Sequence, residues 1–144
     1  MRELLDAFQA AERAGVQALG RWLTACRDPR LRGGLRVLRA RDARHAELAE
    51  ARLRALGGVP TAAVGRELGA LLAVIGNPDV SDRSKVAMLL GRAPLHARSP
   101  LADAAARLAH DPETQALLET IGDDEQIAVE WLRRMADLLE REPG

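Results

Sequence analysis

The stretch from Asp28 to Gly58, DPRLRGGLRVLRARDARHAELAEARLRALGG, carries the signals that decide the fold. An Asp-Pro pair is typical of a helix start, because the aspartate caps free N–H groups and proline suits the first turn. The pair Gly57-Gly58 ends the helix. Between these points, apolar positions recur every three or four residues and predict one long amphipathic helix to Leu56. Its inward stripe is Leu31, Leu35, Leu38, Asp42, His45, Ala49, Leu53 and Leu56.

The same signals predict a long helix on each side of this one. Apolar residues at three- and four-residue spacing predict a first helix over residues 2–26. A second Asp-Pro pair, Asp111-Pro112, begins a last helix that reaches about Arg141.

A crossover of roughly 25 residues separates the first two long helices from the rest, and we expect a short helix over 61–75 within it, followed by a loop. A third long helix is expected over 83–109, capped by Ser81 or Asp82. Two prolines inside this helix predict a kink or an interruption around His96.

This order of elements predicts an all-α protein. Ala and Leu, both strong helix formers, dominate a chain in which β-branched and aromatic residues are scarce. Short connections make the first pair and the last pair of long helices antiparallel hairpins. The 144 residues, 1–144, therefore predict a single domain built as an antiparallel four-helix bundle with a long crossover between helices two and three.

The charge distribution bears on partners and location. The formal net charge is zero, which argues against a nucleic-acid binder. Residues 1–56 nevertheless hold 12 Arg against 7 acids, and residues 111–144 hold 10 acids against 3 Arg. Either the two regions neutralise each other within the bundle, or they form a charged docking face. The single cysteine, the lack of an apolar leader and the lack of a membrane span lead us to expect a cytoplasmic protein.

Three ionisable residues stand where leucines would be expected on the first two helices: Glu12, Asp42 and His45. Burying carboxylates is costly unless they are paired or bind a metal ion. Counted from the turn at about residue 28, Glu12 and Asp42 both lie roughly 21–24 Å along their helices, since the rise is about 1.5 Å per residue. His45 lies one turn beyond Asp42 on the same face. We therefore expect the three side chains to meet at one level of the core.

Polar residues of the second hairpin reach a similar level. Glu125 lies on the apolar stripe of the last helix, about 14 residues past the turn, at mid-bundle height. The facing level of the third helix falls near residues 95–98, where His96 and Arg98 are the polar candidates. We expect these two side chains to contact the ligand residues rather than the metal itself. If no metal binds, we expect Arg98 to neutralise the carboxylates.

Four stretches together resemble a known family: Ala11-Glu12-Arg13-Ala14-Gly15, Asp42-Ala43-Arg44-His45, the run from His45-Ala46-Glu47-Leu48 to Leu56-Gly57-Gly58-Val59-Pro60, and Asp124-Glu125 with Trp131-Leu132. On these motifs the chain resembles the ferritin-like superfamily, specifically the rubrerythrin- and bacterioferritin-type di-iron bundles. Members of this superfamily carry a Glu on two helices and a Glu-x-x-His on the other two. The chain departs from the pattern at Ala128, where the second His would stand, and on the third helix.

The resemblance implies a ferritin-like bundle and, as activities, di-iron or di-manganese oxidation, oxygenation, peroxide reduction or iron storage. The departures favour a vestigial or single-metal site, with Glu12, Asp42, His45 and Glu125 holding one divalent ion, iron or manganese. An iron- or manganese-dependent oxidase or oxygenase is the alternative, and a metal-free interaction bundle is another. A homodimer through helix faces is one expected assembly, and the sequence indicates neither a substrate nor a redox partner.

Overall fold

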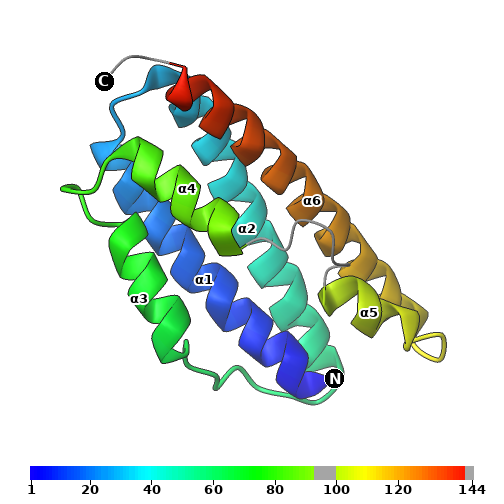
Figure 1. Ribbon diagram of the computed structural model, residues 1–144. Coiled ribbons are helices and arrows are strands. Elements are labelled where there is room, and N and C mark those ends of the chain that lie inside the picture. The colour runs from blue at the N-terminus through cyan, green and yellow to red at the C-terminus, as the bar shows by residue number, and fades with distance from the viewer. Residues whose placement is uncertain (93–99, 142–144) are drawn as a thin grey trace. The chain divides into compact units, whose positions relative to one another are not determined.

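A computed structural model describes residues 1–92 and 100–141, and within them all regular structure is helical. The described residues form six helices, which are labelled or coloured along the chain in Figure 1. They are α1 (Arg2–Ala25), α2 (Pro29–Ala55), α3 (Arg66–Ile75), α4 (Asp82–Arg92), α5 (Pro100–Ala106) and α6 (Pro112–Glu140). None of these described helices is long and apolar enough to cross a membrane. The chain divides into two compact units, Met1–Lys85 and Val86–Gly144, and the prediction of one domain over 1–144 stays a prediction.

The ends of α2 lie where the sequence predicts them. The Asp28 carboxylate accepts a hydrogen bond from the backbone N–H of Arg30 at 2.9 Å, and Pro29 occupies the first turn. At the other end Gly57 adopts a positive φ of 87°, which favours glycine because a side chain would be strained there. The N–H of Gly58 then reaches back to the carbonyl of Leu53 at 2.9 Å, which closes the helix in a Schellman-type cap.

The core of the first unit forms where α1 packs against both α2 and α3. Its fully buried side chains include Leu5 and Trp22 on α1, Leu31, Leu35 and Leu53 on α2, and Ile75 on α3. Apolar spacing along α1 predicts an inward stripe that includes Leu5, Phe8, Leu19 and Leu23. Leu5 and Leu19 are buried, but Gln9 and Trp22 are buried where Phe8 and Leu23 are only half-buried. The difference arises because two neighbouring helices cover α1 and bury a wider arc than a single stripe.

The crossover helix is shorter than the predicted 61–75, because α3 begins only at Arg66. The backbone N–H groups of Thr61 and Ala62 instead donate to the carboxylate of Asp6 on α1, at 3.1–3.2 Å. Since those N–H groups are held by a distant side chain, the segment before Gly65 runs as an extended loop along α1.

Two helices, α4 and α5, occupy the region in which the sequence predicts one interrupted helix over 83–109. Ser81 caps α4, because its hydroxyl accepts the N–H of Ser84 at 3.1 Å. Residues 93–99, which include His96 and Arg98, lie outside the described residues.

The second unit contains a helix pair of its own, in which α5 packs against α6. The amide of Gln115 on α6 donates to the carbonyl of Ala105 on α5 at 2.9 Å. The Asp111 carboxylate accepts the N–H of Thr114 and caps α6, as the second Asp-Pro pair predicts.

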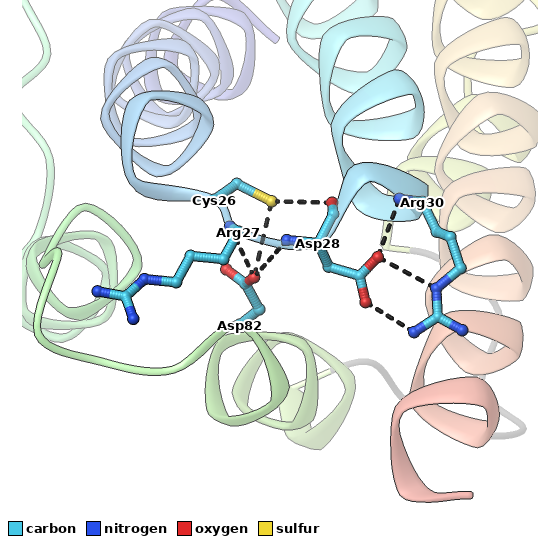
Figure 2. A network of polar contacts seen from close by, with 5 residues as sticks. All are labelled: Cys26, Arg27, Asp28, Arg30 and Asp82. Carbon is cyan, nitrogen blue, oxygen red and sulfur yellow. Dashed lines mark hydrogen bonds and ion pairs between the residues drawn. The ribbon is translucent and has the colours of Figure 1, made fainter. Parts of the chain in front are cut away.

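Asp82 joins the start of α4 to the turn between α1 and α2 (Figure 2). One of its carboxylate oxygens accepts the N–H groups of Arg27 at 3.1 Å and Asp28 at 3.2 Å, and also the Cys26 thiol at 3.7 Å. The other oxygen accepts the indole N–H of the buried Trp22 at 2.9 Å. The carboxylate therefore satisfies backbone donors that the three-residue turn leaves without helical partners.

The thiol of Cys26 is a poor nucleophile in this setting. Burial raises its pKa, and the negative charge of Asp82 raises it further. The thiol therefore stays protonated at neutral pH, where only the thiolate would react.

Replacing Asp82 by alanine should lower the free energy of unfolding by about 1–3 kcal/mol, because buried donors then lose their acceptor. Urea unfolding followed by circular dichroism measures this change. The matched control is Asp79→Ala, an exposed acid in the preceding loop, which should stay within about 0.5 kcal/mol of wild type. Equal effects from both substitutions would show that Asp82 does not hold the turn.

Candidate metal centre

A short turn sets the height of the ligand-type side chains on α1 and α2. Glu12 lies 13 residues before the last residue of α1, Ala25, and Asp42 lies 13 residues after the first residue of α2, Pro29. At a rise of about 1.5 Å per residue, both stand about 20 Å from the turn. His45 follows Asp42 by three residues and shares its face.

The structure brings these three side chains together. Glu12, Asp42 and His45 each offer a ligand atom, and these atoms all lie within 4.8 Å of one another. His45 is only 3 % exposed, and the two acids are half-buried. The common depth that the sequence predicts for Glu12 and Asp42 is therefore confirmed.

The contact between Glu12 and His45 is close but is not a hydrogen bond. Glu12 Oε2 lies 3.8 Å from His45 Nδ1, beyond hydrogen-bonding distance. This carboxylate oxygen is fully buried and accepts no hydrogen bond from the residues that the structure describes. Because a buried acceptor without a donor is costly, a cation at this point would lower the free energy of the folded state.

Asp42 carries the largest electrostatic perturbation of the cluster. Burial raises its pKa to about 8, repulsion from Glu12 and a hydrogen bond with Glu12 add to the rise, and the charges of His45 and Arg41 oppose it. At neutral pH the carboxyl group therefore keeps its proton and shares it with Glu12. The proton offsets the clash of two buried acids, which is also what a metal ion would do.

Arg41 is the contributor that sequence reasoning missed. Its half-buried side chain lowers the pKa of Asp42, a neutralising role that the sequence assigned to Arg98 instead. The available signal was its position immediately before Asp42, at the margin of the inward stripe of α2.

The structure does not test the remaining predicted site residues. Glu125 is half-buried on α6, in the second unit, and its membership of the cluster stays a prediction. His96 and Arg98 fall within 93–99, outside the described residues.

A shallow cleft follows the α1–α2 pair at the level of the cluster. It encloses about 250 Å³ and is lined by Arg13, Val16, Gln17, Ala43, Ala46 and Glu47. Three of these residues directly follow Glu12, Asp42 and His45 in the chain, so the cleft flanks the same helical turns.

Comparison with known proteins adds no relative, because no family model, no curated protein and no solved structure matches the chain. The class that the structure itself defines is an all-α protein in which a Glu/Asp/His group that could hold a metal ion lies between two packed helices.

The raised pKa of Asp42 predicts how stability changes with pH in the metal-free protein. Between about pH 4 and pH 8 the folded chain keeps a proton that the unfolded chain has released, so stability falls as pH rises through this range. Asp42→Asn removes this dependence. At pH 8 its free energy of unfolding should exceed that of wild type by roughly 1–3 kcal/mol.

Denaturant unfolding with chelator present, at pH 5 and pH 8, measures this difference. Asp79→Asn, which changes an exposed acid, is the control. Its free energy of unfolding should vary with pH as that of wild type does. Parallel stability curves for wild type and Asp42→Asn would contradict a raised pKa at Asp42.

Proposed function

We propose that this protein is a ferritin-like metal-binding protein that holds one divalent ion, iron or manganese, through Glu12, Asp42 and His45. One observation carries the proposal: two carboxylates and one imidazole from two helices converge within 4.8 Å around a buried carboxylate oxygen. Ligand atoms bound at about 2.1 Å to one ion stand roughly 3.0–4.2 Å apart, so small side-chain rotations would complete the geometry.

The donor set suits a hard or borderline divalent ion. Carboxylates favour manganese and iron(II), and imidazole suits iron. Two carboxylates balance a charge of +2, provided that Asp42 gives up its proton as the ion binds. One ion fits better than two, because the cluster contains a single His and Ala128 stands where the resemblance would place the second.

The three side chains would act as metal ligands rather than as general acids or bases. Glu12 and Asp42 bind the ion from opposite helices, and His45 binds it from the same face as Asp42. A bound ion would supply Lewis-acid or one-electron chemistry at positions left open by the protein. Glu125 or water would complete the coordination shell, and an oxidase or oxygenase would need such an open position.

A metal-free helical protein is the second candidate, and one observation favours it. The hydrogen bond between Glu12 and Asp42 already compensates part of the cost of burying two acids, with Arg41 and His45 offsetting the remaining charge. In that case the cluster is a buried polar network that specifies how α1 pairs with α2.

Metal content distinguishes the candidates. Protein purified without chelator, then loaded anaerobically with iron(II) or with manganese(II), should contain about one ion per chain by elemental analysis. Two ions per chain would support a di-metal oxidase or oxygenase. An empty protein after loading would leave the metal-free network.

His45→Ala should weaken metal binding by about 100-fold in calorimetric titration, because it removes the only imidazole of the cluster. His110→Ala is the matched control, since His110 is exposed in the turn that precedes α6. Equal affinities of His45→Ala and wild type would overturn the assigned ligands.

A separate substitution tests Glu125. If Glu125 completes the coordination shell, Glu125→Gln should weaken metal affinity by about tenfold, whereas Glu119→Gln on the exposed face of α6 should not. An unchanged affinity in Glu125→Gln would remove Glu125 from the ligand set and leave the other three in place.

A further inference from the structure

The outer face of α2 is basic from Leu31 to Ala46, and at the end of this stretch the carboxylate of Glu47 lies 3.9 Å from the guanidinium of Arg44. Between Leu31 and Ala46, the exposed charged side chains are all arginine: Arg32, Arg36, Arg39 and Arg44. The one acid of this stretch, Asp42, belongs to the buried cluster. The guanidinium group of Arg39 packs against Gly20 of α1. The other three arginines, with Gly33, Val37 and Ala40, form what we call the basic face.

An exposed apolar centre accompanies the charge. Val37 is 59 % exposed, and its neighbours on the basic face, Gly33 and Ala40, are small. A Cβ atom placed on Gly33 would have no neighbouring atom within 4 Å, so the helix surface is open at this residue. Small residues beside a single apolar side chain allow another helix to approach closely.

The outer face of α6 has the opposite sign. Between Leu118 and Trp131 the exposed charged side chains are all acidic, and helical spacing puts Glu119, Asp123 and Glu130 on one side. Ile127 lies among them and is 52 % exposed. These four residues form what we call the acidic face.

The two faces match in length as well as in charge. Arg32 to Arg44 spans about 18 Å and Glu119 to Glu130 about 17 Å, at a rise of about 1.5 Å per residue. Each face carries one large exposed apolar side chain, Val37 or Ile127. Pairing two basic faces or two acidic faces would bring like charges together, so only the mixed pairing is favourable.

From this complementarity we infer that two copies of the chain associate, with the basic face of α2 in one copy docked on the acidic face of α6 in the other. Each exposed ion pair contributes less than about 1 kcal/mol and is screened by salt. The association is therefore reversible, and raising NaCl from 50 mM to 500 mM should weaken it by about tenfold or more.

Charge reversal tests this pairing. One variant carries Arg32→Glu with Arg36→Glu, so both of its faces are acidic. The other carries Asp123→Arg with Glu130→Arg, so both of its faces are basic. Each variant alone should sediment as a monomer at a concentration at which wild type associates. An equimolar mixture should associate again, because opposite faces then meet between the two kinds of chain.

The mixing step separates pairing between copies from pairing within one chain. If the two faces neutralised each other inside one chain, wild type would be a monomer and the mixture would not associate, which would overturn the proposal. A wild type that associates without responding to either reversal would overturn it as well.

A matched control reverses two exposed arginines away from the basic face. Arg66→Glu with Arg83→Glu makes the same change in net charge and places acids in the first turns of α3 and α4, where they are well tolerated. This variant should associate as wild type does. Circular dichroism of all variants verifies that each one is folded. If the control also became monomeric, net charge rather than the two faces would govern association, and the proposal would fail.

Discussion

The structure of the first unit depends on the register of α1 against α2. Three residues, Cys26 to Asp28, connect the two helices, and the carboxylate of Asp82 holds the backbone of this turn. Because a helix is a rigid rod, a fixed turn sets which residues face each other far along the pair. A slip of one helical turn, about 5.4 Å, would move Glu12 away from the level of Asp42, so the two carboxyl groups could no longer share a proton.

Charge on α2 is sorted by face. The inward face carries Asp42 and His45, which meet Glu12 in a partly buried cluster where a shared proton or a cation offsets the cost of two adjacent acids. The outward face carries arginines around an exposed Val37. The inner group costs stability unless it is neutralised, which is typical of functional sites, while the outer group costs little because water solvates it. The helix thus joins the candidate metal centre to the proposed docking face.

The sequence alone determined the features that depend on neighbours within about four residues. Both Asp-Pro pairs start helices as predicted, and Gly57 supplies the positive φ that ends α2. The common level of Glu12 and Asp42 also followed from the sequence, because a short turn and a constant helical rise leave a single register. The inward phase of His45 follows from its spacing to Asp42.

Only the tertiary structure decided the features whose partners are far apart in the chain. Asp82, expected as a local helix cap, binds a turn more than fifty residues away, and Asp6 takes the N–H groups that would have begun a longer α3. The effect of Arg41 on the pKa of Asp42 likewise depends on packing, since its charge matters only where a buried carboxyl group lies beside it. Local patterns cannot report such contacts, because a side chain meets a distant backbone donor only after the helices have packed.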